Sequence, residues 1–593
     1  MTPHDLFSSL APTPAAYLKA AREVAAMDGS GMKTVRAAIL STFTAQVLEP
    51  YLVVESARRS LKLSSWFAPW GQLEEQALDP SSELYAQKPS VVILLVRLEE
   101  LVPDFLRRLS DSRPALDRMI ADVEARVRNL MEGIRRNSSA TVLVSNFIPP
   151  FDLPTGLADA MLADSRTALV QQLNAILARI CNEVSGAYVF DLARIAAMHG
   201  VSTWRDLKLF YMARVPMSVS AQIAVGRGLA RTLRAALLPP AKVLVLDLDN
   251  TLWGGVLGED GIGGIALGDE YPGNVYKAFQ RYLLGLKDRG FLLAVATKNN
   301  PTDVEELWAK HQDCVLRKDD FGAIRINWQE KSVNLCEIAA ELNVGRESLV
   351  FFDDSAFERE EVRRGAPEVT VIETPASPLG YIDAVEESGL FDRLILSAED
   401  AQRAVLYQVQ AERTRLEQTA SSPEEFLKSL KLQATIGPVN AETLPRVAQL
   451  LAKTNQFNLT IRRHTDAEIA AMIDQGGIAL WLRLADRFGD NGLVGVAIAV
   501  PESDAHWRVD TFLLSCRVIG RRVETALLAD LSQRIRQKNG CILVGEYLAG
   551  PKNALVADFY PQHCFCPVGA GRWERDLAAE PLSSPDCVQV SSL

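Results

Sequence analysis

The chain has 593 residues, of which 48% are hydrophobic and 23% are charged, the balance of a folded globular protein rather than a disordered one. At roughly 150 residues per domain, this length predicts three or four domains, each able to bury a core. The formal net charge of −11 disfavours a nucleic-acid partner, because such a partner needs a basic surface.

The N-terminal sequence MTPHDLFSSLAPTPAAYLK lacks the basic start and apolar run of a signal peptide. No later stretch reaches the roughly 20 apolar residues that a membrane span needs. We therefore expect a cytoplasmic protein without membrane contact. The eight cysteines show no paired CxxC spacing, so neither a zinc site nor a disulfide framework is expected.

The first part of the chain predicts a leader over residues 1–34 and an α/β domain over 35–238. Short apolar runs of strand type alternate with longer helical patterns, which favours a parallel sheet. These runs span residues 34–43, 89–98, 140–147 and 186–195. The proline pair in LLPPAK, residues 237–242, cannot continue the preceding helix and marks a domain boundary.

A second doubly wound α/β domain is predicted over residues 241–394. Its strands KVLVLDL, FLLAVAT and SLVFFDD carry polar residues at their carboxyl ends, where open α/β sheets bind ligands. A helix-rich stretch from about 396 opens a third, α+β domain over 396–577, with antiparallel strands, a helix and a closing strand CILVGEY. Residues 578–593 are expected to be a loose tail.

Two carboxylates, Asp247 and Asp249, stand one residue apart at the end of the buried strand VLVL. Like charges at such a place repel each other and lose hydration, so a cation or a proton must compensate. Magnesium (Mg²⁺) takes carboxylate and phosphate oxygens and meets this need. Asp-x-Asp followed by Thr251 is also a common helix-cap or loop pattern, and the pair alone does not separate the two interpretations.

Three further segments supply matching groups. Thr297 ends the next apolar strand, Lys331 begins a helix, and Asp353 and Asp354 end another strand. Together they offer a nucleophilic carboxylate, a second carboxylate, a hydroxyl and a cation for phosphate oxygens, and acidic metal ligands. This order and spacing resemble the haloacid dehalogenase superfamily of aspartyl-phosphate phosphotransferases.

The resemblance implies a role for each residue. Asp247 is the expected nucleophile and Asp249 the expected acid and base, while Thr297, Lys331 and Asn299 would hold the phosphate. The Mg²⁺ ligands are expected to be Asp247, Asp353 and the backbone carbonyl of Asp249, with Asp354 either an outer ligand or a partner that supports the ligands. The connections between these motifs are too short for a folded cap, so we expect a Rossmann-like domain without a large cap.

The motifs LDLDNTLWGGVLGEDG, ATKNN, INWQEKSVN, FFDDSAFEREEVR, KTNQFNLTIRR, DRFGDNGLVGV and LLSCRVIGRRVE resemble the FkbH-like family of polyketide biosynthesis, over about residues 205–565. That resemblance implies dephosphorylation of D-1,3-bisphosphoglycerate and transfer of the glyceryl unit, through a cysteine thioester, to the phosphopantetheine arm of an acyl carrier protein. An acyl phosphate is already activated towards a thiolate, whereas the phosphate monoester needs the aspartate site.

The third domain resembles acetyltransferase-type folds. Cys516 precedes the RVIGRR turn, so it is the expected thioester residue: a helix dipole and three arginines could lower its pKa, namely Arg517, Arg521 and Arg522. The alternative is a small buried strand residue, and Cys564 and Cys566 are second candidates. Arg522 stands where pyrophosphate loops of that type have glycine or alanine, which argues against coenzyme A binding.

The first domain resembles the SGNH-hydrolase-like module. Ser41 stands where its nucleophile would be, but STF replaces Gly-Asp-Ser, and neither Asp191 with His199 nor Asp206 supplies the expected base motif. We therefore expect a non-catalytic domain. In the third domain, residues 453–463 (KTNQFNLTIRR) predict either a solvated loop or a receptor for glycerate hydroxyls or a phosphate.

Three functions remain open from the sequence. The first is a phosphatase coupled to glyceryl transfer onto an acyl carrier protein. The second is a stand-alone magnesium phosphatase acting on a phosphorylated macromolecule. The third is a non-catalytic scaffold for carrier proteins, whose function would be unaffected when Asp247 is replaced by Asn.

Overall fold

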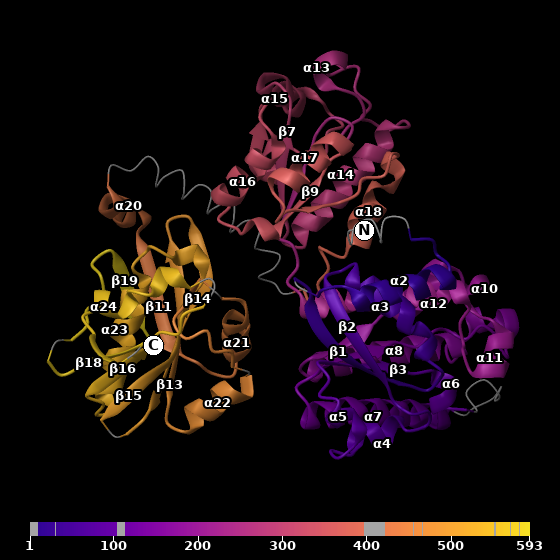
Figure 1. Ribbon diagram of the computed structural model, residues 1–593, viewed down its shortest axis with the longest axis horizontal. Helices are drawn as coiled ribbons and strands as arrows, with labels where there is room; N and C mark the ends of the chain where they lie inside the picture. Colours follow the sequence, from indigo (N-terminus) through magenta and orange to yellow (C-terminus); the bar gives the residue numbers. More distant parts are fainter. Residues whose placement is uncertain are drawn as a thin grey trace. The chain divides into compact units, whose positions relative to one another are not determined.

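The computed structural model contains three β-sheets, which follow one another along the chain (Figure 1). It describes residues 10–29, 31–103, 113–396, 422–454, 456–464, 466–503, 505–550, 553–569, 571–579 and 581–593. The chain divides into two compact units, one of residues 1–240 and 386–395, the other of residues 241–385 and 396–593. The predicted helix-rich stretch after 396 lies almost wholly outside the described residues.

The N-terminal sheet is parallel throughout and has the strand order β2-β1-β3-β4-β5. Its strands are β1 (Lys33–Ser41), β2 (Leu61–Phe67), β3 (Val91–Leu95), β4 (Thr141–Ser145) and β5 (Ala187–Phe190). The sequence analysis missed β2, because LKLSSWF is only half apolar at the edge of the sheet.

Helices cover both faces of this sheet, as the doubly wound pattern requires. They are α2 (Pro14–Ala26), η1 (Gln46–Leu48), α3 (Glu49–Ala57), α4 (Leu73–Leu78), α5 (Glu83–Ala86), α6 (Leu98–Leu101), α7 (Arg113–Asn137), η2 (Gly156–Met161), α8 (Arg166–Glu183), α9 (Leu192–His199), α10 (Val201–Trp204), α11 (Leu207–Ala213) and α12 (Val219–Leu237). One core layer packs α7 and α8 on the sheet, and the other packs α3 and α12.

The expected leader contains a packed helix. Thr13 caps α2, whose apolar side, including Tyr17 and Val24, is buried against α3 and α12. The Tyr17 hydroxyl also donates to Glu55 over 2.6 Å. The interpretation of residues 1–34 as a leader therefore fails for residues 14–26, because their apolar residues recur at helical spacing and find a partner surface.

The central sheet is also parallel, with the order β10-β9-β6-β7-β8. Its strands are β6 (Val243–Leu246), β7 (Leu292–Thr297), β8 (Phe321–Ile326), β9 (Leu349–Phe352) and β10 (Thr370–Val371). The helices are α13 (Leu257–Asp260), α14 (Gly273–Asp288), α15 (Pro301–Lys310), η3 (Lys318–Asp320), α16 (Lys331–Glu341), η4 (Arg346–Ser348), α17 (Ala356–Gly365), η5 (Pro378–Gly380) and α18 (Tyr381–Ser388).

Strand β6 is the centre of this sheet. It pairs with β7 on one side and β9 on the other, and its four residues are completely buried. On one face α16 and α17 pack on the strands. On the other face the rings of Phe279, Phe352 and Tyr381 meet edge to face or tilted, which joins α14, β9 and α18.

The C-terminal sheet is mixed, with the order β17-β18-β16-β15-β14-β13-β11-β19 and β12 beside β15. Its strands are β11 (Leu432–Pro438), β12 (Phe457–Asn458), β13 (Ile478–Asp486), β14 (Gly489–Pro501), β15 (His506–Leu514), β16 (Ile542–Glu546), β17 (Cys566–Gly569), β18 (Arg572–Asp576) and β19 (Val588–Ser592). The helices are α20 (Pro423–Leu430), α21 (Leu444–Lys453), α22 (Asp466–Asp474), η6 (Cys516–Val518), α23 (Val523–Gln537), η7 (Ala554–Val556) and α24 (Phe559–Gln562).

The expected loose tail is wrong in part. Strand β19 pairs in parallel with β11, and Val588 enters the same core as α20 and α23. The Ser592 hydroxyl donates to Asp530 over 2.5 Å, and the amide of Leu593 donates to the carbonyl of Ile436. No helix of the described residues is long and apolar enough to cross a membrane.

Candidate active site

The predicted phosphate-site residues lie at one edge of the central sheet. Asp247 follows β6, Thr297 ends β7, and Asp353 follows β9, so parallel strands deliver all three at their carboxyl ends. The chain leaves β6 towards β7 on one side, while β9 lies on the other. Such a reversal of strand order leaves a crevice at the carboxyl ends, which is where doubly wound sheets bind ligands.

Lys331 connects the carboxylates. At the first position of α16 its ammonium group lies 2.8 Å from Asp247 Oδ1 and also pairs with Asp353. Lys331 and Asp353 are 2% and 0% exposed. Burial alone would lower the pKa of Lys331, but the charges of Asp247 and Asp353 outweigh burial and raise that pKa, so the side chain stays protonated.

Lys331 therefore supplies part of the positive charge that the carboxylates around Asp247 need. Burial, and then the negative charge of Asp247, raise the pKa of Asp353. The same two causes raise the pKa of Asp354, which is less buried. Removing Lys331 would leave these carboxyl groups facing one another without compensation.

Asp249 has a separate set of partners. Its Oδ1 accepts hydrogen bonds from Trp253 Nε1 at 2.8 Å and from the amide of Leu257 at 3.1 Å. Its Oδ2 accepts from Asn299 Nδ2 at 2.8 Å. Burial raises the pKa of Asp249, and these hydrogen bonds oppose the shift only in part. The carboxyl group is thus both fixed in direction and more ready to hold a proton than an exposed aspartate.

Asn299 therefore contacts the expected acid rather than standing free for a phosphate. Asp249 and Thr251 do not directly precede a helix, since Thr251 lies in a turn after Leu248 and the next helix begins at Leu257, whose amide donates to Asp249. The Thr251 hydroxyl is fully buried and has no hydrogen-bond partner among the described residues.

The acidic residues fit a divalent metal ion. Carboxylate oxygens of Asp247, Asp353 and Asp354 lie within 4.8 Å of one another. Three carboxylates form a hard oxygen set of the kind that Mg²⁺ prefers. Asp353 Oδ1 is held by the amide of Ser355, and the backbone carbonyls of Asp353 and Asp354 accept from Arg359 Nη1.

Arg359 and Tyr381 were missed by the sequence analysis. Arg359 is 8% exposed and fixes the turn that carries the two aspartates, while the Tyr381 hydroxyl donates to the carbonyl of Asn250 over 2.8 Å. Asn250 adopts a left-handed backbone, with φ of 53°. An arginine six residues after Asp353 in a helical segment was the available signal, but an exposed helical arginine has the same pattern.

The crevice is covered by short elements only. In the described stretch between β6 and α14, the one helix is α13, and Gly254 pairs with Ala266 in a single bridge. Gly254 approaches Tyr276 so closely that an added Cβ would lie 2.9 Å from its ring. Between β7 and β8 there are only α15 and η3. Neither described connection contains a folded cap.

The C-terminal domain places the expected thioester cysteine at a turn. Cys516 begins η6, just after β15, but its side chain lies outside the described part of the structure. Arg517 Nε donates to Ser515 Oγ over 3.2 Å, and Arg521 is paired with the buried Asp486. Arg522 has a φ of 59° and stands at the N-cap of α23, exposed.

The other cysteines divide by burial. Cys564 and Cys566 are exposed, and Cys566 lies on the edge strand β17. Cys336 is half-buried on α16. In the KTNQFNLTIRR segment, Asn458 and Thr460 are buried and Arg462 is ion-paired, so the solvated-loop interpretation is wrong for these three. Lys552 lies outside the described residues, and Asn553 is buried.

The candidate hydrolase residues of the N-terminal domain form local hydrogen bonds. The Ser41 hydroxyl donates to the carbonyl of Phe43 at 2.5 Å, and Asp191 caps α9 while accepting from Asn146. His199 contacts Ser220. No hydrogen bond joins Ser41 to Asp191 or His199 in the described part of this domain, and the SGNH-like assignment stays a prediction.

The class of protein follows from these observations. The chain is a multidomain α/β protein whose central domain carries carboxylates and a lysine at a sheet crevice. A similar solved structure is the N-terminal part of the protein BF1531 from Bacteroides fragilis, which contains a phosphatase domain complexed with Mg. The two are 28% identical, with a TM-score of 0.57, over 64% of this chain and 99% of that one.

A family model matches the N-terminal domain. Residues 36–228 match the family model described as FkbH, N-terminal domain. The predicted resemblance to the FkbH-like family is thereby confirmed.

Further solved structures align with about a quarter of the chain. One is a putative GNAT-family acetyltransferase from Desulfovibrio desulfuricans, 15% identical over 24% of this chain and 99% of that one, with a TM-score of 0.20. Another is Ard1 from Thermoplasma volcanium, also 15% identical over 24% of this chain and 97% of that one, with a TM-score of 0.19. Scores this low decide nothing about the third domain. No curated protein matches the sequence.

Proposed function

We propose that this protein is a magnesium-dependent phosphatase coupled to acyl transfer, which removes phosphate from D-1,3-bisphosphoglycerate and passes the glyceryl unit through a cysteine thioester to an acyl carrier protein. The observation that carries the phosphatase part is Lys331, buried between Asp247 and Asp353 at the carboxyl edge of the central sheet. The similarity to the BF1531 phosphatase domain supports it.

The residues at this edge suit nucleophilic phosphoryl transfer. Asp247 attacks the phosphorus atom, forming an aspartyl phosphate, and the bond from phosphorus to the leaving oxygen breaks. Asp249, held by Trp253 and Asn299, donates its proton to that leaving oxygen. It then takes a proton from the water that cleaves the aspartyl phosphate, so the two carboxyl groups have different tasks.

Lys331 and Thr297 offer positive charge and a hydroxyl for the phosphate oxygens. Asp247, Asp353 and Asp354 would hold Mg²⁺, which, when bound, neutralises charge on the transferring phosphoryl group. The burial of Lys331 strengthens its field at the phosphate, because few water molecules screen it.

The acyl-transfer part rests on the resemblance to the FkbH-like family and on Cys516 at the η6 turn. A Cys516 thiolate attacks the acyl-phosphate carbonyl, phosphate leaves, and a thioester remains. The phosphopantetheine thiol of a carrier protein then attacks this thioester and releases the cysteine.

Intact-protein mass spectrometry tests the whole proposal. The purified protein is mixed with D-1,3-bisphosphoglycerate, Mg²⁺ and a phosphopantetheinylated carrier protein. A glyceryl-sized increase on the carrier, absent with Cys516→Ser and present with Cys564→Ser, is the expected result. Phosphate release without an acyl adduct on either protein would leave the second candidate, a stand-alone phosphatase, which the open and uncapped crevice also accommodates.

A further inference from the structure

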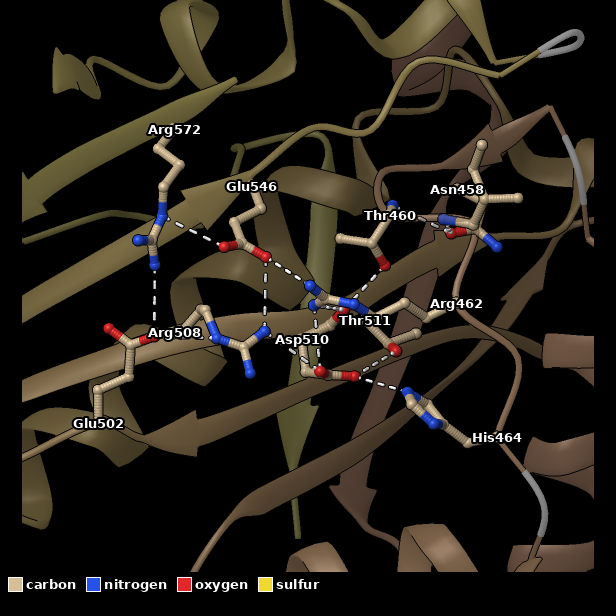
Figure 2. Close-up of polar contacts among 11 residues, drawn as sticks. Asn458, Thr460, Arg462, His464, Glu502, Arg508, Asp510, Thr511, Glu546 and Arg572 are labelled. Atoms are coloured by element: carbon tan, nitrogen blue, oxygen red, sulfur yellow. Dashed lines mark hydrogen bonds and ion pairs between the residues drawn. The ribbon is translucent and has the colours of Figure 1, made fainter. Parts of the chain in front are cut away.

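A histidine and a buried carboxylate meet in the C-terminal domain, far along the chain from the phosphate site (Figure 2). His464 Nε2 lies 2.7 Å from Asp510 Oδ2. Asp510 lies on β15 and is 5% exposed. A ring nitrogen facing an ionised carboxylate carries its hydrogen, so the basic lone pair of His464 is on Nδ1. Nδ1 has no hydrogen-bond partner among the described residues.

Asp510 is held in its ionised form. Burial by itself would raise its pKa, but the hydrogen bond to His464 and the charge of Arg462 outweigh burial and lower that pKa. Arg462 and Arg508 approach Oδ1 at 3.1 and 3.2 Å, and the Thr511 hydroxyl donates to Oδ2 at 3.1 Å. An ionised, immobile carboxylate behind an imidazole fixes the orientation and the tautomer of the ring.

The segment that carries His464 is strained and tightly supported. Ile461 has a φ of 55°, a left-handed backbone conformation that is rare for a β-branched residue. The fully buried Asn458 accepts hydrogen bonds from the amides of Ile461 and Thr460. Gly550 approaches so closely that an added Cβ would lie 2.2 Å from Ile461 Cδ1. The strained turn brings Arg462 and His464 back to Asp510.

The pair lies where two parallel strands separate. The β15–β16 ladder runs from His506 to Arg508 and stops before Asp510. Beyond it, β12 pairs with the end of β15, and Leu459 connects the Phe512 carbonyl to the Leu548 amide. Beyond Arg508 the segment that carries His464 lies beside β15 instead, where the Thr460 hydroxyl and Arg462 Nη1 donate to the carbonyl of Asp510.

The surrounding charges balance, which argues against an anion site. Arg462 pairs with Glu546 at 2.7 Å, Arg508 with Glu502 at 3.0 Å, and Arg572 with Glu546 at 3.2 Å (Figure 2). Each guanidinium group that Figure 2 labels thus faces a carboxylate. A receptor for a phosphate needs a surplus of positive charge, whereas an imidazole that moves protons needs only a fixed carboxylate and a free nitrogen.

We propose that His464 and Asp510 form the acid–base pair of a second active centre, which acts on the thiol acceptor during acyl transfer. The proposal rests on the transfer function proposed above. His464 Nδ1 takes the proton of the attacking thiol as its sulfur bonds to the thioester carbonyl carbon. The bond from that carbon to the cysteine sulfur then breaks, and the imidazolium returns the proton to the leaving sulfur. His464 is the catalytic residue and Asp510 is a positioning residue.

The test separates the two centres in the full-length protein. Phosphate release is measured with 4-nitrophenyl phosphate, and acyl transfer to a phosphopantetheinylated carrier protein is followed by mass spectrometry. His464→Ala is expected to slow transfer by about 10²–10⁴-fold and to leave phosphate release unchanged. Added imidazole should restore part of the transfer rate, which a purely structural loss would not allow. Asp510→Asn should lower the maximal transfer rate more than it changes the half-saturating carrier concentration.

His506→Ala is the matched control. His506 lies on the same strand, and among the described residues its ring forms a hydrogen bond with Ser503 only. His464→Gln keeps an amide donor for Asp510 but has no basic nitrogen, so it guards against a folding defect. Two results would overturn this proposal and leave the proposed function standing. One is a His464→Gln variant that transfers the acyl group at the wild-type rate, and the other is a slow His464→Ala variant whose transfer rate imidazole does not raise. Absence of transfer in the wild-type protein would overturn the proposed function and this inference together.

Discussion

The ammonium group of Lys331 lies 2.8 Å from Asp247 Oδ1 and also pairs with Asp353, so one buried cation joins carboxylates from two neighbouring strands. The three side chains come from β6, β9 and α16, and none is more than 10% exposed. A buried charge is tolerated only when it is paired, which makes each member depend on the other two.

Replacing Lys331 by Met should therefore uncouple this cluster. We expect the free energy of unfolding of the central domain to fall by about 3–5 kcal/mol, because two buried carboxylates lose their counter-charge. Mg²⁺ should raise the unfolding temperature of Lys331→Met more than that of the wild type, since the ion then meets no competing ammonium group. Thermal unfolding with and without MgCl₂ measures both effects.

Lys310→Met is the control, because Lys310 forms an exposed ion pair with Glu306 on α15. Its stability should change by less than about 1 kcal/mol. Equal Mg²⁺ shifts in Lys331→Met and the wild type would argue that the ion does not bind at the Asp247 cluster.

Replacing Asp247 by Asn should abolish the chemistry and preserve the shape of the site. An amide is a poor nucleophile, so phosphate release should fall by about 10³-fold or more. Steady-state phosphate release measures this loss, and an unchanged unfolding temperature shows that the fold is retained. Retained turnover would place the nucleophile elsewhere in the protein.

Asn299→Ala should lower the rate of the chemical step more than substrate binding. Its amide donates to Asp249 over 2.8 Å, and a hydrogen bond to a charged group contributes about 1.5–3 kcal/mol. We expect kcat to fall about 10- to 100-fold with KM almost unchanged. Asn300→Ala is the neighbouring control, since Asn300 contacts Asp303 on the surface. A rise in KM at constant kcat would instead make Asn299 a phosphate ligand.

Protonation of Glu524 should contribute to the stability of the C-terminal domain as the pH falls. Its Oε2 is buried at the start of α23 and has no hydrogen-bond partner among the described residues, and burial raises the pKa of Glu524. A raised folded-state pKa means that the folded protein binds the proton more tightly than the unfolded chain. This contribution therefore favours folding increasingly as the pH falls from 7 towards the unfolded value of about 4.3.

Glu524→Gln removes this titration. The variant should unfold at a higher temperature than the wild type at pH 7, and the difference should shrink as the pH falls and disappear near pH 4. Calorimetry across this range tests the sign, with the exposed Glu442→Gln as control. A variant less stable than the wild type at pH 7 would show that the ionised carboxylate is compensated.

Deleting residues 588–593 should destabilise the C-terminal domain. The deletion removes β19, its ladder with β11, the buried Val588 and the bond from Ser592 to Asp530. We expect a loss of about 2–5 kcal/mol in the free energy of unfolding, from the buried side chain and the ladder hydrogen bonds. Urea unfolding measures it, and Gln589→Ala, on the exposed side of the strand, should be nearly neutral.

Much of the phosphate site could be predicted because several of its residues end or follow a short apolar run in the sequence. VLVL before Asp247, LLAVAT ending in Thr297, and LVFF before Asp353 are continuous apolar runs, and their burial in a parallel sheet is complete or nearly so. Parallel strands must end at a common edge, so the polar residues after these runs were expected to meet. The contact between the Asn299 amide and Asp249 was not predicted.

The ends of the chain were harder to interpret. Most of the apolar residues of PAAYLKAAREVAA are alanines, which bury little surface, and Val588 and Val590 stand in a short polar segment. Neither hydrophobic pattern is stronger than the pattern of an ordinary exposed segment. Helix α2 and strand β19 are stabilised instead by surfaces distant in sequence, on α3 and β11, and tertiary packing commonly overrides weak local preference in this way.

The sequence by itself determined where the buried strands of the central domain end and which reactive groups follow them, because hydrophobic periodicity and strand-end chemistry are local properties. Only the tertiary structure decided that Lys331 stands between Asp247 and Asp353 and that His464 faces Asp510. Those pairings depend on the divergence of strands, a left-handed residue at Ile461 and the exclusion of water around buried charges. None of these is encoded in the spacing of residues along the chain.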